Sequence, residues 1–351
     1  MLGGPPSAVA LLAHNPNNAV TGGIWWVGVG DRSAVVKVLT DGTGHTGPAW
    51  WQASADDRHW NSWRRELRAY RSDLARHVRP DGLDAPDLLH LDERADGTVV
   101  LWLAAVDGRS AAALTVDDIV EVAGRLGRAQ GRLAATGGWD EPWLSESYLA
   151  DYSASKPFDP ALLTDDAAWA HPRVARYLGP HQTGIARLHE QRGRLLELSR
   201  ACPRTLCHLD LWPANIIRPA EGPIVLVDWS FCGDGALGED LGNLIPDSVF
   251  DLFLPTDALE ELATRAEAAY LAGVAASGWD GDERWVQLGI RSAAVKYRWL
   301  VQRLLEVPDI DAVAYGDRRV ARDDLYAARA AGLALLGQWA QEALDLGAAL
   351  T

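Results

Sequence analysis

One stretch, residues 207–228, constrains the fold of this chain more than any other. It reads Cys-His-Leu-Asp-Leu-Trp-Pro-Ala-Asn-Ile-Ile-Arg and, after a short linker, Ile-Val-Leu-Val-Asp. Its polar members are His208, Asp210, Asn215 and Asp228. The aliphatic runs around them predict short strands over 206–209, 215–217 and 224–227. Strands that flank a loop, which Pro213 makes rigid, would bring the two carboxylates and the carboxamide together.

These residue types match the requirements of phosphoryl transfer, in which a protein mainly positions a hydroxyl, holds magnesium against the phosphates and offsets charge. Asp210 would accept or orient the proton of the attacking hydroxyl. Asn215 and Asp228 offer hard oxygen ligands to Mg²⁺, which takes few protein ligands and completes its shell with phosphate and water. Short motifs of this kind also occur by chance in polar loops, so the rest of the chain has to supply the context.

The pattern His-x-Asp-x-x-x-x-Asn, followed by an aliphatic strand that ends in Asp, resembles the aminoglycoside phosphotransferase and choline kinase group, relatives of the protein kinases. The resemblance implies an α+β, two-lobed protein-kinase-like fold. Its N-terminal lobe holds a five-stranded antiparallel sheet and one helix, and a larger, mainly helical C-terminal lobe follows. ATP or GTP and Mg²⁺ are the implied cofactors. Asp210 takes the catalytic position of the family, which leaves His208 to hold the catalytic loop through hydrogen bonds.

The start of the chain predicts three antiparallel strands, over 7–14, 22–29 and 34–39, separated by turns rich in Asn and Gly. The third strand carries Lys37 among aliphatic residues. A lysine there needs an anion or a path to solvent, because burying an unpaired ammonium is costly. Two interpretations stay open: an edge lysine that reaches water, and the phosphate-binding lysine of the related kinases.

The loop at 15–21 separates the first two strands and corresponds to the loop that covers the phosphates in kinase-like folds. We expect nucleotide contacts at Asn17 and Asn18, made through backbone N–H groups. Gly22 and Gly23 would allow the close approach of a phosphate. The loop is not a Gly-x-Gly-x-x-Gly sequence, so its evidence is weaker than that of the strand with the lysine.

Apolar residues at spacings of three and four predict an amphipathic helix over 57–77. Glu66 lies within it, and the resemblance implies that it pairs with Lys37. The alternative for Glu66 is an ordinary solvated pair with neighbouring arginines. Strands over 87–91 and 98–103 would complete the five-stranded sheet.

The resemblance places the hinge between the lobes at residues 104–108, where backbone groups near Leu103 and Ala105 would bond the adenine edge. The expected N-terminal nucleotide-binding lobe is therefore 1–103. The expected helical C-terminal lobe is 109–351, with the catalytic loop at 206–217, the metal-binding strand at 224–228 and helices that bind the acceptor.

The C-terminal lobe opens with a helix that Thr115 caps and that ends before Gly137. Further helices are predicted over 144–152, 174–201, 257–271, 283–305 and 323–346. Asp240 follows the metal-binding strand, and the resemblance implies that it braces the catalytic loop from below. The alternative for Asp240 is a simple acidic residue in the first turn of a helix.

The net charge of −15 argues against nucleic acid or an anionic membrane surface as a partner and mildly favours a cationic acceptor. Three cysteines are too few for a disulfide framework and suit a reducing compartment. The start of the chain lacks the pattern of a signal peptide, and no apolar run reaches the length of a membrane helix. We expect a cytoplasmic monomer or homodimer.

The order of these features predicts a phosphotransferase that moves the γ-phosphoryl group of ATP, or GTP, to the hydroxyl of a small molecule. An aminoglycoside-like compound, an amino sugar or another natural product is the expected acceptor. One alternative is a kinase that phosphorylates Ser or Thr of a peptide precursor. A nucleotide-binding pseudokinase is another, and the presence of the lysine, the glutamate, the base and both metal ligands argues against it. A metal-dependent hydrolase is the last, and it would leave Lys37 and the hinge unexplained.

Overall fold

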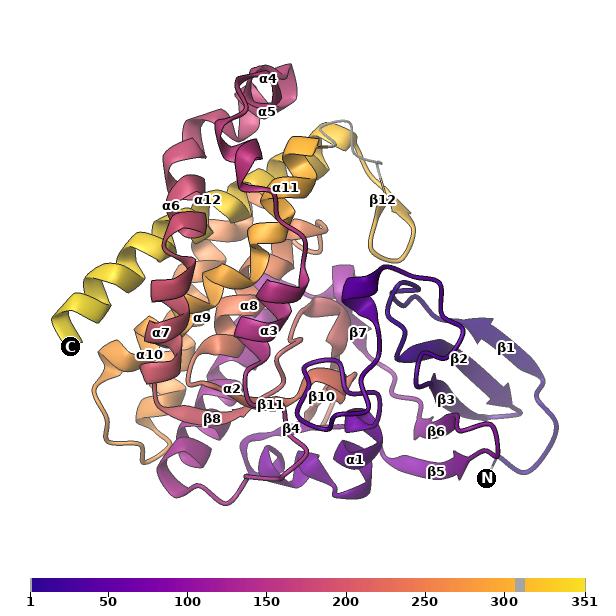
Figure 1. The fold of residues 1–351 in the computed structure, drawn as a ribbon. Helices are drawn as coiled ribbons and strands as arrows, with labels where there is room; N and C mark the ends of the chain where they lie inside the picture. Colours follow the sequence, from indigo (N-terminus) through magenta and orange to yellow (C-terminus); the bar gives the residue numbers. More distant parts are fainter. Residues whose placement is uncertain (1, 307–312, 351) are drawn as a thin grey trace.

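An antiparallel sheet forms most of the N-terminal lobe in the computed structural model, which describes residues 2–306 and 313–350 (Figure 1). Its strands are β1 (Ala8–Leu11), β2 (Thr21–Val29), β3 (Arg32–Leu39), β5 (Leu88–Glu93) and β6 (Val99–Ala104). They pair in the order β1-β2-β3-β6-β5, so the sheet of five antiparallel strands is confirmed. β3 lies at the centre of this sheet rather than at its edge, which places Lys37 inside the lobe.

The helix of this lobe, α1 (Arg65–Arg71), is much shorter than the predicted helix over 57–77. It ends early because Asp73 has φ of 53°, a left-handed conformation, and Leu74–His77 forms a separate 3₁₀ segment. It starts late because of the fully buried guanidinium of Arg65, which donates to the carbonyl oxygens of Asp57, His59 and Trp60 at 2.6–2.9 Å. The guanidinium is planar and has five N–H donors, so it can bind several carbonyl oxygens at once. These oxygens are then not available for the backbone hydrogen bonds of a helix. The same side chain reaches the Ser230 carbonyl at 3.4 Å and so ties the two lobes together.

Helices build the C-terminal lobe, as predicted (Figure 1). They are α2 (Val116–Thr136), α3 (Tyr148–Ser155), α4 (Asp166–Ala170), α5 (Pro172–Tyr177), α6 (Gln182–Glu190), α7 (Arg192–Ala201), α8 (Glu239–Phe250), α9 (Leu259–Ala275), α10 (Glu283–Ser292), α11 (Arg298–Glu306) and α12 (Arg322–Leu350). Thr115 caps α2 in a capping box with Asp118. α2 and α9 pack so closely that no side chain fits at Gly127. A Cβ there would lie 2.2 Å from the Tyr270 carbonyl oxygen.

Short strands at the junction of the lobes carry the polar motif. They are β4 (Leu83–Asp84), β7 (Arg109–Ser110), β8 (Arg204–Cys207), β9 (Ile216–Arg218), β10 (Ile224–Leu226) and β11 (Gly233–Ala236), while β12 (Val313–Ala314) and β13 (Arg318–Arg319) form a separate hairpin. β9 and β10 pair antiparallel, and β8 pairs with β11. The loop between β8 and β9 is therefore fixed at its start by the pairing of β8 with β11 and at its end by the pairing of β9 with β10.

Two long helices of the prediction are interrupted. The stretch predicted at 174–201 is divided into α5, α6 and α7, and Gly179-Pro180 accounts for the first break, because proline lacks an N–H and restricts the residue before it. The stretch predicted at 283–305 is divided by a 3₁₀ segment, Ala293–Tyr297. This segment carries Lys296 and Tyr297, both of which are buried.

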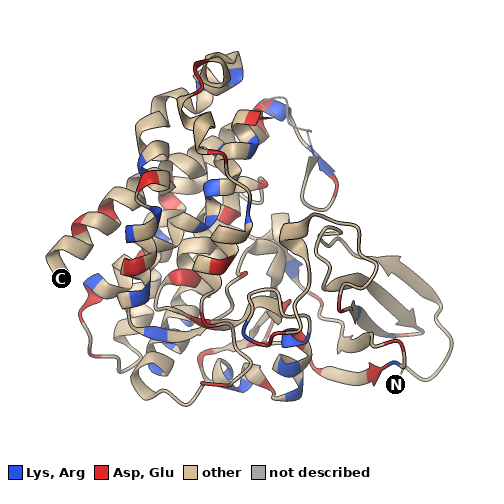
Figure 2. Cartoon of the chain, in the orientation of Figure 1, with Lys and Arg blue, Asp and Glu red and all other residues tan. Residues whose placement is uncertain are grey.

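Charged residues of both signs are interspersed along the helices rather than gathered by sign (Figure 2). The net charge of −15 is thus spread over the molecule. Within residues 2–306 and 313–350, no helix combines the length and the apolar character needed to cross a membrane.

Candidate active site

A buried ion triad joins three elements at the centre of the molecule. Lys37 Nζ, on β3, lies 2.6 Å from Glu66 Oε2 on α1 and 2.7 Å from Asp228 Oδ1, just beyond β10. Lys37 is 3% exposed and Glu66 is 1% exposed, so neither is the solvated surface residue of the alternative interpretation. The predicted pairing of Lys37 with Glu66 is present in the geometry, and Asp228 is its third member.

Charge in the triad is set by burial and by the shared lysine. Burial alone would lower the pKa of Lys37, but the carboxylates of Asp228 and Glu66 outweigh it and hold that pKa above its ordinary value. Burial also acts to raise the pKa of Asp228, yet Lys37 brings it below the usual range. For Glu66 burial prevails and raises the pKa to about 7. Lys37 and Asp228 are therefore both charged at neutral pH.

The catalytic loop turns tightly so that Asp210 and Asn215 face each other. The Asn215 Nδ2 amide donates to the backbone carbonyl of Asp210 at 2.9 Å and to its Oδ2 at 3.2 Å. Leu209, just before the aspartate, has φ of 65°, a left-handed conformation that redirects the chain after β8. The loop thus holds the Asp210 carboxylate in one place, as the positioning of an attacking hydroxyl requires.

Asp240 braces this loop from α8. Its carboxylate, fully buried, accepts the backbone N–H of His208 and of Leu209, both at 2.7 Å, and the Gln130 amide at 2.8 Å. Asp240 does lie in the first turn of α8, but all three donors come from outside that helix, so its contacts go beyond those of a simple helix-start acid. Charge-assisted bonds of this length are the strong ones, so Asp240 fixes the start of the catalytic loop.

His208 is also held rather than free. Its Nε2 bonds the Val227 carbonyl at 3.0 Å, and its ring packs at 4.8 Å from that of Trp229. Burial lowers the pKa of His208, which favours the neutral ring. These contacts connect the catalytic loop to the strand that precedes Asp228, in agreement with the holding role.

Asn215 and Asp228 present the oxygen donors that a magnesium site needs. The amide nitrogen of Asn215 is engaged by Asp210, which leaves its carbonyl oxygen for a cation. The Asp228 side chain is 31% exposed in an otherwise buried cluster, so a cation from solvent can reach it. One carboxylate, one carboxamide and the phosphates of a nucleotide form the kind of oxygen set that Mg²⁺ accepts. The residues fit the ion, and they would hold it against the phosphates and offset their charge.

The proposed nucleotide contacts are less well supported by the geometry. The N–H groups of Asn17 and Asn18 both donate to Asn15, at 3.0 and 3.2 Å. Asn18 Oδ1 accepts the Val20 N–H and the Asn61 amide, so its side chain braces the loop from inside. The two asparagines therefore shape the loop, and their predicted contact with phosphate stays a prediction.

At the hinge, Leu103 lies in β6, paired with Val35 and Leu88, and Ala105 follows the end of the strand. The Ala104 N–H donates to the Asp87 carbonyl at 2.9 Å. The adenine contacts predicted for Leu103 and Ala105 also stay predictions.

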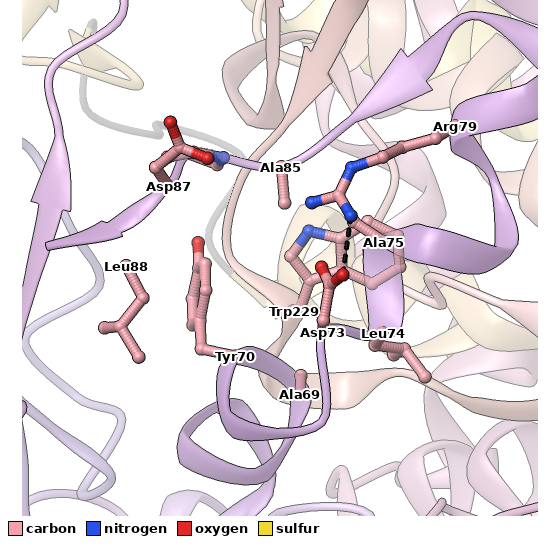
Figure 3. Close-up of a pocket in the computed structure, with 11 residues that line it drawn as sticks. Ala69, Tyr70, Asp73, Leu74, Ala75, Arg79, Ala85, Asp87, Leu88 and Trp229 are labelled. Carbon is pink, nitrogen blue, oxygen red and sulfur yellow. Dashed lines mark hydrogen bonds and ion pairs between the residues drawn. The ribbon is translucent and has the colours of Figure 1, made fainter.

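A pocket of about 270 Å³ lies beside α1, which contributes Ala69 and Tyr70 to its lining (Figure 3). Trp229 lines it as well, together with Ala85 and Leu88. Trp229 directly follows Asp228, and the Trp229 indole donates to the Leu226 carbonyl at 2.9 Å. One wall of this pocket is thus the residue that follows Asp228 in the chain.

Two further lysines are buried near the loop that carries Asp210, and sequence reasoning missed both. The chain has only three lysines among its 33 basic residues, and all are buried: Lys37 at 3%, Lys156 at 5% and Lys296 at 4% exposure. Lys296 Nζ bonds the Leu209 carbonyl at 3.4 Å and lies 4.0 Å from Asp247 Oδ2. The rarity of lysine was the signal in the sequence that could have found them.

Lys156, at the end of α3, is enclosed by aromatic rings. Its Nζ lies 3.3 Å from the ring centroid of Trp51, 4.4 Å from that of Tyr152 and 5.1 Å from that of Trp60. It has no hydrogen-bond partner among the residues that the structure describes. Contacts with rings stabilise a desolvated cation by about 2 kcal/mol, whereas burying an ion costs several kcal/mol. The rings therefore offset only part of the cost of this buried amine.

We expect the protonation of Asp210 to cause the loss of activity at low pH. Burial raises the pKa of Asp210 to about 6, and the Lys296 cation opposes that rise. A proton acceptor must be ionised, so kcat/KM should fall as the pH drops below about 6. In Lys296→Met the opposing cation is gone, and the acid limb should move to higher pH by roughly one unit. The pH profile of kcat/KM for both proteins measures this, and an unmoved limb would contradict the assignment.

The two lobes, the ion triad and the braced loop define a protein of the kinase-like fold. The sequence profile of the phosphotransferase enzyme family matches residues 24–285, and the chain belongs to that family. Comparison with curated protein sequences gave no significant match.

Solved structures share the fold at low sequence identity. An amicoumacin kinase in complex with AMP-PNP, Ca²⁺ and Ami is 15% identical, with a TM-score of 0.55, over 97% of this chain and 89% of that one. A spectinomycin phosphotransferase in complex with ADP and spectinomycin is 9% identical, with a TM-score of 0.55, over 96% and 95%. A thermostable mutant of an aminoglycoside phosphotransferase, APH(4)-Ia, is 15% identical, with a TM-score of 0.51, over 95% and 94%.

Proposed function

We propose that this protein transfers the γ-phosphoryl group of magnesium-bound ATP, or GTP, to a hydroxyl of a small molecule. The observation that carries the proposal is the Lys37 ammonium held between Glu66 and Asp228, with Asp210 and Asn215 on the adjoining loop. Lys37 would contact phosphate oxygens, and Asn215 and Asp228 would hold the metal. Asp210 would receive the hydroxyl proton.

The division into lobes at 1–103 and 109–351, with a hinge at 104–108, belongs to the same proposal. The triad supports it, because Lys37 and Glu66 come from the first part and Asp228 from the second. A nucleotide bound at the triad would therefore lie between the parts. The ligands of the structural neighbours, AMP-PNP and ADP, are consistent with a nucleotide at this place.

The acceptor class is the finer part of the proposal, and we place it among natural products that carry hydroxyl groups. The test measures ADP or GDP release with Mg²⁺ and either nucleotide, in the presence of aminoglycosides, other sugars or Ser/Thr peptides. Release that depends on a small hydroxyl compound supports the proposal. Release that depends only on peptides would favour the peptide kinase, and nucleotide hydrolysis without transfer to any acceptor would favour the hydrolase.

A further inference from the structure

The aromatic cluster beside the catalytic loop contains hydrogen-bond donors that lack acceptors. Tyr148, Tyr152 and Trp60 pack there with Leu209, the residue before Asp210. Lys156 Nζ and Tyr148 Oη are buried, and neither has a hydrogen-bond partner in the described part of the chain. The indole N–H of Trp299, which packs against the same cluster, is likewise unpartnered there. Three buried donors without an acceptor in one place call for an explanation, because such groups are rare in folded proteins.

The two lysines are neighbours in this cluster. Lys156 Nζ lies 4.4 Å and Lys296 Nζ 5.8 Å from the centroid of one ring, that of Tyr152. Burial, together with the Lys296 cation and against the opposing charge of Asp210, lowers the pKa of Lys156 to about 7. Lys156 therefore shares its surroundings with the proposed catalytic carboxylate.

The carboxylates near this cluster have other partners. Asp247 accepts the Tyr297 hydroxyl at 2.5 Å, and Asp234 pairs with Arg204 at 3.1 Å. Glu146, at the outer edge, pairs with Arg58 at 2.5 Å. Within the described part of the chain no carboxylate forms an ion pair or hydrogen bond with Lys156, although carboxylates pair with Lys37 and Lys296.

We propose that the phosphoryl acceptor carries an anionic oxygen group, a carboxylate or a phosphate, which binds Lys156 while its hydroxyl lies at Asp210. This inference rests on the proposed function and replaces the cationic acceptor that the net charge favoured, because that charge is spread over the molecule. The hydroxyl of Tyr148 and the indole N–H of Trp299 would donate to the same anionic group. Trp51, which is half-buried, forms the nearest wall of the cage and has to shift to admit the ligand.

The test uses acceptors in matched sets that differ only in charge. Glucuronate, glucuronamide and glucosamine share a pyranose ring, and glycerate, glyceramide and 3-aminopropane-1,2-diol share an open three-carbon chain. Glucose 6-phosphate separates phosphate from carboxylate, and sulfate is an anion without a scaffold. Calorimetry measures their binding to the full chain loaded with Mg²⁺ and a non-hydrolysable ATP analogue. We expect an anionic member to bind at least tenfold more tightly than its neutral partner. Lys156→Met should abolish that preference, and Lys156→Arg should retain part of it.

The control is Arg58→Met, which removes an exposed cation near the same cluster and should leave the preference unchanged. Lys156→Gln replaces Lys156→Met if the latter fails to fold, and the binding of the ATP analogue to each variant reports an intact nucleotide site. Three results would overturn the inference: tightest binding of the amines, an anion preference that survives in Lys156→Met, or no charge-dependent binding of any probe, sulfate included. Loss of nucleotide binding by the wild-type chain would instead reject the proposed function itself.

Discussion

Asp210→Ala should lower the rate of phosphoryl transfer by roughly 10³-fold or more, because it removes the group that receives the hydroxyl proton and positions the acceptor. Binding of the magnesium nucleotide should change little, since the Asn215 amide keeps its bond to the Asp210 backbone carbonyl at 2.9 Å and the Lys37 triad is untouched. Steady-state ADP release with a working acceptor measures the first effect, and calorimetry with a non-hydrolysable ATP analogue measures the second.

Asp151→Asn is the matched control for this variant. Asp151 is an exposed carboxylate on α3, on the same side of the molecule, and its replacement should leave turnover near that of the wild type. Normal turnover by Asp210→Ala would refute the role assigned to Asp210. Loss of nucleotide binding together with turnover would mean that the loop had collapsed, and Asp210→Asn, which keeps the shape of the side chain, then distinguishes the two causes.

Asp240→Ala should destabilise the folded protein by about 3–5 kcal/mol, because it leaves two backbone N–H groups without an acceptor in the buried base of the loop that carries Asp210. Those groups belong to His208 and Leu209, whereas the Gln130 amide keeps the Leu206 carbonyl at 3.3 Å. Urea unfolding followed by tryptophan fluorescence measures the change in the free energy of unfolding. Turnover should fall as well, since the loop that carries Asp210 loses its brace.

An exposed acid in the first turn of a helix provides the comparison for Asp240. Asp117 lies at that position of α2 and pairs with Arg265 at the surface. Its replacement by Ala should cost less than about 1 kcal/mol. Equal effects of the two replacements would show that Asp240 acts only as a helix-start acid.

Local patterns carried the prediction of the sheet and of the polar motif. The run of β-branched residues around Lys37 and the aliphatic run before Asp228 predict strands whatever their surroundings, and both strands are present. The resemblance then gave the order of the lobes. Sequence could not give the start of α1, because the buried guanidinium of Arg65 gathers carbonyl oxygens that the helical pattern had assigned to the helix.

The proposed role of Lys156 in binding the acceptor could not be predicted from the sequence, for a different reason. Lys156 is followed by a proline and lies in no recognisable motif, and its aromatic cage combines Trp51 and Trp60 of one lobe with Tyr152 of the other. Only the docking of the lobes brings these residues together. Net charge, which favoured a cationic acceptor, is a property of the whole chain and says little about a buried cluster.

The dependence of nucleotide binding on magnesium tests the central claim most directly. The wild-type chain should bind ATP or GTP tightly with Mg²⁺ and at least tenfold more weakly without it, since the phosphates bring several negative charges to a site that holds Asp228. Asp228→Ala should lose most of this dependence, because it removes the one carboxylate that we assign to the metal. Binding that is unaffected by Mg²⁺ in the wild-type chain, or no nucleotide binding at all, would contradict the assignment of this site to phosphoryl transfer.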